Sequence, residues 1–168
     1  MFRLKAYLVV LLVASGAYAI TFDHLLMALN TTQRIWTRTR SLRADHCACV
    51  HECQYHVKLS LDRHHYKFLN YYICSGKMQK RYLYGQLIPH MERQLGPVMR
   101  VSMCPGAPAV DYTLRYWNHH ERCAIYTITL RGRTECEMHV WDDRVDTKVP
   151  NCYMQYYQYC HKQHPLYS

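Results

Sequence analysis

An acid, an imidazole and an indole occupy alternate positions near the C-terminal end of the chain. The stretch TECEMHVW, residues 134–141, is rich in strand-forming residue types and places Glu137, His139 and Trp141 two positions apart. Successive side chains of a strand point to opposite faces, so these three share one face. A carboxylate inside a protein needs a cation or hydrogen-bond donors, and the ammonium group of a ligand is such a cation.

Tyrosines on another segment are suited to help Glu137 hold a ligand. Tyr112 and Tyr116 can donate their hydroxyls to a carboxylate while their rings pack against a flat aromatic ligand. With these neighbours, Glu137 would be the main anchor for a cationic ligand. The alternative is structural: Arg38, Arg40 or a tyrosine hydroxyl satisfies the acid within the fold.

The cysteines indicate an oxidising compartment and disulfide bonds. Nine follow residue 19, an odd number, so at least one is free, capped or bonded to another chain. They are at positions 47, 49, 53, 74, 104, 123, 136, 152 and 160. The stretch HCACVHEC, residues 46–53, has zinc-ligand types at close spacing, but thiols of a secreted protein oxidise, so we expect no metal and no cofactor.

The first 19 residues have the pattern of a secretory signal peptide. Arg3 and Lys5 precede an apolar run that is too short to span a bilayer, and Ala17 and Ala19 are small residues suited to cleavage. Residues 20–168 would then form a single domain with 19 basic and 12 acidic side chains, a net charge of +7. We therefore expect a secreted, monomeric protein with no membrane or nucleic-acid partner.

Most of the remaining chain reads as short strands separated by turn residues. The predicted strands span residues 33–42, 51–61, 65–74, 80–88, 97–103, 110–117, 122–130 and 135–141. No helix long enough for a crossover separates them, so the sheet must be antiparallel and up-and-down. Eight such strands can close into a barrel that removes its own edges and holds one small ligand. The predicted fold class is therefore all-β.

Two helices flank the strands. The stretch FDHLLMALN, residues 22–30, has Asp23 as a possible N-cap and apolar residues on one side. It ends at the glycosylation sequon that begins with Asn30, which predicts a surface turn. The stretch NCYMQYYQYCHK, with Asn151 as a possible N-cap, predicts a C-terminal helix packed on the outside of the sheet.

Several stretches resemble, in order and spacing, the salivary lipocalins of ticks, the histamine-binding protein family. They are ALNTTQRIWTRTRSLRAD, HECQYHVKLS, GPVMRVS followed by PAVDYTLRYWNHHERCAIYTI, and TECEMHVWDDRVDTKVPNCYMQYYQYC. The resemblance covers nearly the whole chain after residue 19 and is strongest from Gly96 to Cys160. It implies an eight-stranded lipocalin barrel with a C-terminal helix, secreted at the feeding site to sequester host mediators such as histamine, serotonin or lipids.

The resemblance also implies disulfides. Cys123 would bond to Cys152 and so join the C-terminal helix to the barrel, and Cys160 would bond to Cys53. Helical spacing leaves open a second partner for Cys160, namely Cys136. We expect the unpaired cysteine among those at positions 47, 49, 74 and 104.

The sequence departs from the amine-binding pattern of this family. Members that bind amines have a Cys-Asp-aliphatic run where this chain has Cys123 followed by Ala124, and an aromatic residue at the position of His139. One strand acid is thereby lost. Asp45 matches the place of another family acid that contacts an amine, and Leu42 replaces an aromatic residue.

Three functions can be compared on this basis. The first is sequestration of a small ligand, either a monovalent biogenic amine such as histamine or, alternatively, a lipid mediator. The second is a protein-binding lipocalin with a vestigial cavity, whose basic, tyrosine-rich surface engages a host protein or a polyanion. Catalysis is disfavoured, because the histidines and cysteines form no recognisable nucleophile and base motif.

Overall fold

The computed structural model describes residues 19–42, 52–90, 96–130 and 132–167. Its elements, in chain order, are helix α1 (Phe22–Leu29), strands β1 (Ile35–Arg40), β2 (Glu52–Leu61), β3 (His65–Cys74), β4 (Lys77–Ile88), β5 (Val98–Ser102), β6 (Ala109–Asn118), β7 (Cys123–Leu130) and β8 (Arg133–Trp141), the 3-10 turn η1 (Asp142–Arg144), helix α2 (Pro150–Tyr159) and strand β9 (His164–Pro165).

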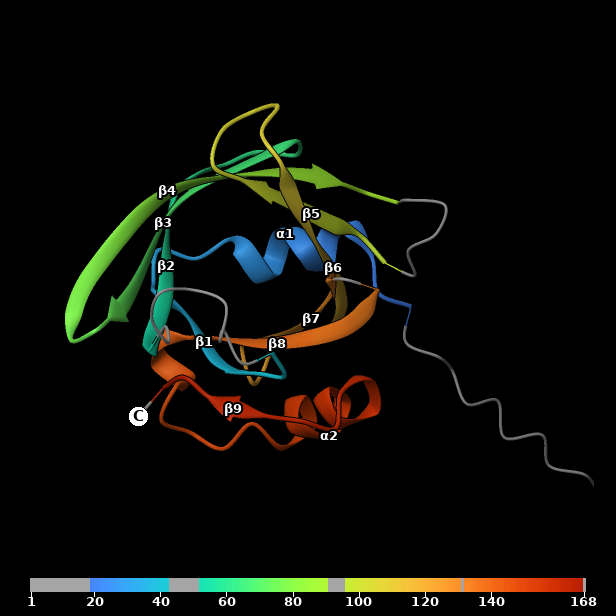
Figure 1. Cartoon of the computed structure of the whole chain (residues 1–168). Helices are drawn as coiled ribbons and strands as arrows, with labels where there is room; N and C mark the ends of the chain where they lie inside the picture. The colour runs from blue at the N-terminus through green and yellow to red at the C-terminus, as the bar shows by residue number, and fades with distance from the viewer. Residues whose placement is uncertain (1–18, 43–51, 91–95, 131, 168) are drawn as a thin grey trace, which may run out of the picture.

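Eight antiparallel strands close into a barrel. Each strand from β2 to β8 pairs with its neighbours in sequence, and β1 pairs with both β8 and β2 to complete the ring. The short strand β9 adds to β1 on the outside. In Figure 1 the strands run round α1, while α2 and β9 lie outside the ring. The predicted eight-stranded lipocalin barrel with a helix at each end of the chain is confirmed.

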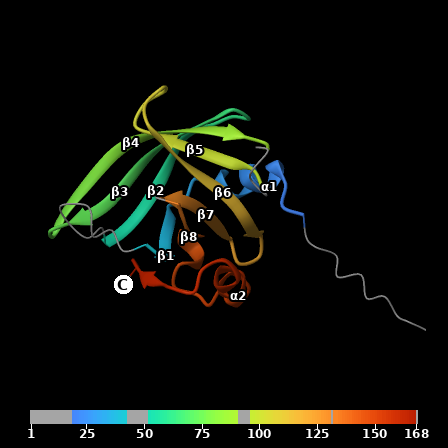
Figure 2. The ribbon, with the colours of Figure 1, turned by 45° about the vertical axis from the view of Figure 1, so that its right-hand side comes forward.

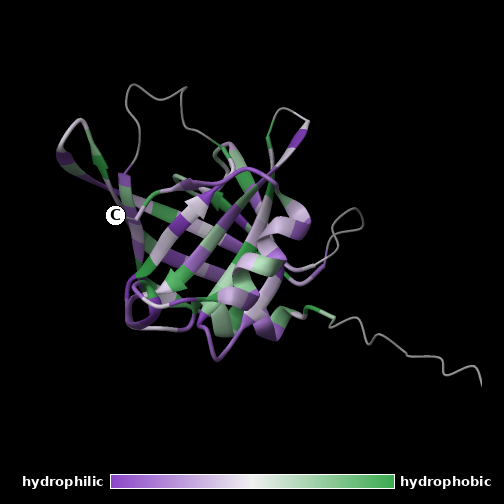
Figure 3. Cartoon of the chain, turned by 90° about the horizontal axis from the view of Figure 1, so that it is seen from below, coloured by the Kyte–Doolittle hydropathy of each residue, from purple (hydrophilic) through white to green (hydrophobic). Residues whose placement is uncertain are grey.

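Alternation along the strands produces two apolar layers. One fills the end of the barrel interior that contains α1, and the other lies between the outer face of the barrel and α2. Strand β7 serves both, because Ala124 and Tyr126 point inward while Cys123 and Ile125 point towards α2. Figure 3 shows hydrophilic and hydrophobic residues alternating along the strands. This pattern fixes which residues reach the interior.

Helix α1 closes one end of the barrel interior. Leu25, Ala28 and Leu29 are buried in the inner apolar layer. The helix begins after Thr21, whose hydroxyl accepts the backbone N–H of His24, while His24 Nδ1 accepts the backbone N–H of Thr21. Thr21 therefore replaces the predicted Asp23 as N-cap, since its side chain forms one half of a reciprocal capping box.

Helix α2 packs across the outer face of β6, β7 and β8, as Figure 2 shows. It begins with Pro150 at its first turn, one residue before the predicted cap Asn151. The carboxylate of Glu121, from the β6–β7 turn, accepts the backbone N–H groups of Asn151 (3.1 Å) and Cys152 (3.0 Å). A distant acid therefore satisfies the free donors that a cap residue would otherwise take.

Two disulfides join this helix to the barrel. Cys123 bonds to Cys152, as the family resemblance implies, and Cys136 bonds to Cys160. The Cys53–Cys160 prediction is wrong, because Cys160 ends α2 beside the outer face of β8, where Cys136 lies, and Cys53 is on β2. Among the described residues Cys53 and Cys104 are free, and Cys74 is disulfide-bonded.

Candidate functional site

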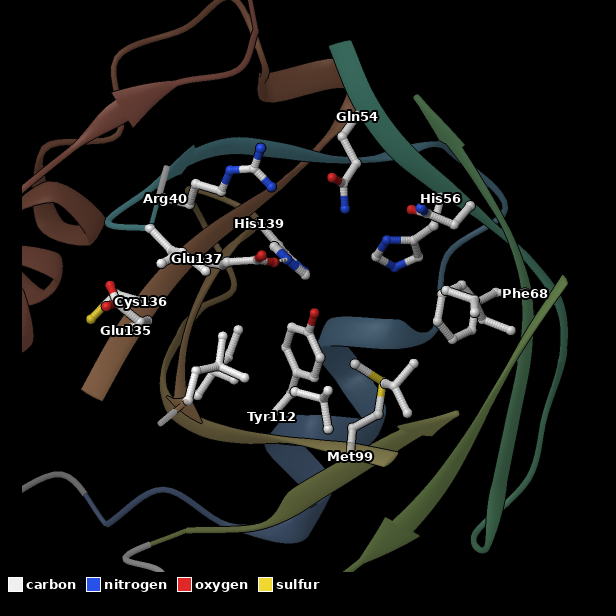
Figure 4. Close-up of a pocket in the computed structure, with 17 residues that line it drawn as sticks. Arg40, Gln54, His56, Phe68, Met99, Tyr112, Glu135, Cys136, Glu137 and His139 are labelled. Atoms are coloured by element: carbon white, nitrogen blue, oxygen red, sulfur yellow. Dashed lines mark hydrogen bonds and ion pairs between the residues drawn. The ribbon is translucent and has the colours of Figure 1, made fainter. Parts of the chain in front are cut away.

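A cavity of about 270 Å³ lies inside the barrel, on the side of the inner apolar layer away from α1. Its lining residues come from all eight barrel strands and from the segment after β1; they are Arg40, Leu42, Gln54, His56, Phe68, Asn70, Leu83, Met99, Val101, Val110, Tyr112, Ile128, Leu130, Glu135, Cys136, Glu137 and His139. Figure 4 shows the labelled side chains around a central space. Apolar walls with a few polar groups are typical of small-ligand sites.

Glu137 and His139 form a buried pair on β8. The distance from Glu137 Oε2 to His139 Nε2 is 2.8 Å, and the side chains are 9% and 6% exposed. The ring of Tyr126 packs against the imidazole with centroids 4.9 Å apart. His139 Nδ1 is buried and has no hydrogen-bond partner among the described residues. The pair therefore presents one unsatisfied polar atom to the interior.

A second imidazole, His56 on β2, lies next to this pair in the cavity lining. The ring centroids of His56 and His139 are 5.5 Å apart in an edge-on arrangement. Burial, together with the nearby His139, holds the pKa of His56 well below its ordinary value, so this ring is neutral at pH 7. Its Nε2 is buried without a hydrogen-bond partner in the described structure.

Tyr112 completes the polar cluster, which consists of Arg40, His56, Tyr112, Glu137 and His139. Figure 4 shows the hydroxyl of Tyr112 pointing into the central space, towards Glu137 and His139. Burial, and secondarily the carboxylate of Glu137, raises the pKa of Tyr112 far above the physiological range. The phenol therefore remains protonated and can donate a hydrogen bond.

The charged residues of the lining are unequal in number. Arg40 lies directly opposite Glu137 in the β1–β8 register, and Glu135 lies two residues before Glu137 on the same strand. The carboxylate of Glu135 accepts the hydroxyl of Ser41 at 2.5 Å. Apart from its imidazoles, the described lining thus carries two carboxylates and one guanidinium, an excess of one negative charge.

The structure places four of the sequence-predicted ligand residues in the lining, namely Glu137, His139, Tyr112 and Leu42. Asp45 falls outside the described residues. Asn30, the predicted glycosylation site, is exposed at the end of α1, where its side-chain oxygen accepts Lys58 Nζ at 2.8 Å. Its glycosylation stays a prediction.

Two predicted residues lie elsewhere. The register of β6 shifts between Leu114 and Tyr116, so Tyr116 turns outward beneath α2 and Trp117 takes the inward position. Trp141 points inward as predicted, but it lies at the α1 end of the barrel. Its Nε1 donates to the carbonyl of Ala28 at 3.0 Å. Neither Tyr116 nor Trp141 lines the cavity.

Sequence reasoning missed His56 and Glu135 as cavity residues. Glu135 carries a signal that would have found it, because it shares the two-residue spacing of Glu137 and His139. For His56 the signal was obscured. The register of β2 shifts between Lys58 and Ser60, so a single two-residue alternation does not predict the inward face of the whole strand.

One cluster of potential metal ligands lies elsewhere in the described structure. Glu121, Cys123 and Cys152 have their ligand atoms within 4.8 Å of one another. Both thiols are, however, oxidised to the Cys123–Cys152 disulfide, and the carboxylate of Glu121 is bonded to the start of α2. This cluster therefore serves the attachment of α2. No helix in the described ranges is long and apolar enough to cross a membrane.

Comparison with known proteins identifies the fold. No protein-family model matches the sequence, and no curated protein does so either. Solved structures match the chain, and one of them is Japanin from Rhipicephalus appendiculatus bound to cholesterol. The TM-score is 0.59 and the identity 16%, over 83% of this chain and 94% of that chain. At this identity the likeness establishes the fold alone, which is that of a lipocalin barrel.

Proposed function

We propose that this protein is a secreted lipocalin that binds one small amphipathic molecule in its barrel and performs no catalysis. The observation that carries the proposal is the cavity itself, which combines apolar walls with a buried polar cluster that has unsatisfied imidazole nitrogens. Buried polar atoms are normally hydrogen-bonded, and a ligand would supply the missing partners. The disulfides and the signal-peptide pattern support secretion.

A biogenic amine such as histamine is the first candidate ligand. The excess negative charge of the lining would be neutralised by one ammonium group, with Glu137 as its main partner. A volume of 270 Å³ corresponds to roughly nine water molecules, which suits a one-ring or two-ring amine. Because the guanidinium of Arg40, opposite Glu137, offsets one of the two carboxylate charges, one ammonium group neutralises the lining. We therefore propose a single amine site.

A lipid mediator is the second candidate. Phe68, Met99 and Ile128 provide apolar wall, and Arg40 could hold an anionic head group. Japanin, whose fold is similar, was solved with cholesterol bound. A lipid much larger than the cavity would need to extend through the mouth or displace side chains such as Met99.

Titration calorimetry of the refolded protein with histamine, serotonin, a leukotriene and cholesterol tests the proposal. We expect saturable one-to-one binding of at least one ligand. A Val101→Trp variant, which fills the cavity from β5, should abolish it, whereas Val57→Trp on the outer side of β2 should not. If none binds, or if Val101→Trp binds as the parent does, the cavity function is wrong.

The biological role follows from the ligand and from the family resemblance. We propose that sequestration of a host amine or lipid mediator blunts inflammatory or haemostatic defence at a feeding site. If no small molecule binds, the alternative is favoured, namely a protein-binding lipocalin with a vestigial cavity.

A further inference from the structure

The hydrogen bond within the Glu137–His139 pair determines which nitrogen of His139 carries the proton. An ionised carboxylate only accepts hydrogen bonds, so His139 Nε2, at 2.8 Å from Glu137 Oε2, must be the protonated nitrogen. In the neutral ring, Nδ1 is then a bare acceptor. This atom is buried and has no partner among the described residues.

The cavity therefore contains a polar atom of defined character. The side chain of His139 is 6% exposed and lines the cavity, so solvent does not satisfy Nδ1 from outside the barrel. A ligand group that donates a hydrogen bond matches Nδ1, whereas a carboxylate presents a second acceptor and repels it. Protonation of the ring turns Nδ1 into a donor. Nδ1 then binds a carboxylate and no longer accepts a hydrogen bond from a donor group.

We propose that His139 determines which head groups the cavity accepts, selecting donor groups in its neutral form and admitting anionic groups after it gains a proton. This inference rests on the proposed function and makes it specific. The neutral pair favours ammonium and hydroxyl head groups. The protonated imidazole, flanked by Glu137 on one nitrogen, offers its other N–H to a carboxylate.

The other titratable and charged groups around the imidazole allow this switch. Arg40 faces the cavity from β1, His56 from β2 and Tyr112 from β6, and Glu135 and Glu137 share β8 with His139. Tyr126 of β7 packs its ring against the imidazole of His139. The two tyrosines keep their protons, because burial raises the pKa of each phenol. Burial disfavours the charged form of His56 and lowers the pKa of that ring, and no carboxylate is bonded to it.

A matched ligand series isolates the head group. Phenethylamine, 2-phenylethanol and phenylacetate share a ring and differ in the terminal group, and the amine and acid keep their charges between pH 5.5 and pH 8. At pH 8 we expect the amine to bind at least about tenfold more tightly than phenylacetate, the scale of one charge-assisted hydrogen bond. At pH 5.5 that ratio should fall by at least about tenfold.

Three variants identify the residue responsible. His139→Asn has no titratable ring, so the affinity ratio of amine to carboxylate should be the same at both pH values. His161→Asn, which replaces an exposed imidazole after α2, is the matched control and should keep the pH dependence of the parent. His56→Asn tests the other buried imidazole of the cavity. Nitrogen-15 NMR of the parent at pH 8 gives an independent readout that needs no variant, since Nδ1 of His139 should be unprotonated and Nε2 protonated.

Each outcome decides the inference. A proton on Nδ1 of His139 at pH 8 overturns it, and so does an affinity ratio that does not change with pH in the parent. Loss of the pH dependence in His56→Asn also overturns it. Tighter binding of phenylacetate at pH 8 would show that Arg40 governs the head group instead. If the series and the ligands of the first titration all fail to bind, the proposed cavity function fails, and this inference fails with it.

Discussion

Replacing Glu137 with glutamine tests the proposed amine anchor with a minimal change of shape. The side chain is 9% exposed, so water screens its charge weakly. A hydrogen bond to a charged group contributes about 1.5–3 kcal/mol, which is about a 12- to 160-fold change in affinity. We expect a loss near the upper end, because Arg40, directly opposite, would then face the ammonium without its acidic neighbour.

Calorimetry with histamine measures this loss, and a neutral or purely apolar ligand should bind the variant almost unchanged. Asp111→Asn is the matched control, because this acid lies on the outer face in an ion pair with Arg100, where a carboxylate contributes little. Histamine affinity equal in the parent and in Glu137→Gln would refute the assignment of Glu137. A parent that binds no amine but binds a fatty-acid mediator tightly would transfer the function to the lipid candidate.

Three further predictions concern the fold. Replacing both Cys136 and Cys160 with alanine should lower the free energy of unfolding by about 3.5 kcal/mol in urea titrations, since the bridge closes a loop with a sequence separation of 24; an unchanged midpoint would contradict this. Glu121→Gln should cost about 0.5–2 kcal/mol by weakening the start of α2, and the same measurement should show no loss if the contact is incidental. His56→Gln should reduce the acid sensitivity of stability: the folded state holds the pKa of His56 below its ordinary value, so the unfolded chain binds the proton more readily, and stability falls as pH drops below about 6.5. A parent and variant with the same pH profile would rule out this origin.

The barrel was predictable because two-residue alternation persists along most strands. All eight predicted strands occur, and the inward direction of Glu137 and His139 follows from their places on one uninterrupted strand. The flanking helices were also predicted, but the predicted caps Asp23 and Asn151 were wrong. Thr21 and Glu121 act through contacts that depend on the geometry of the folded turn, and Glu121 lies about thirty residues from the helix it caps.

The errors in the site have two physical causes. A shift of one residue in strand register turns every later side chain to the other face, and the sequence does not mark where such a shift occurs. The shift in β6 moves Tyr116 beneath α2. The sequence also does not show how far along the barrel axis an inward side chain lies. Trp141 points inward as predicted, but helix α1 fills its end of the barrel, so it does not reach the cavity.

A crystal structure of the protein with its tightest small ligand tests the central claim most directly. We predict the ligand inside the barrel, with its apolar part against Phe68 and Met99 and its polar group within hydrogen-bond distance of the His139 imidazole. A ligand bound with high affinity but seated outside the barrel, with Glu137 and His139 unchanged and untouched by it, would contradict the account.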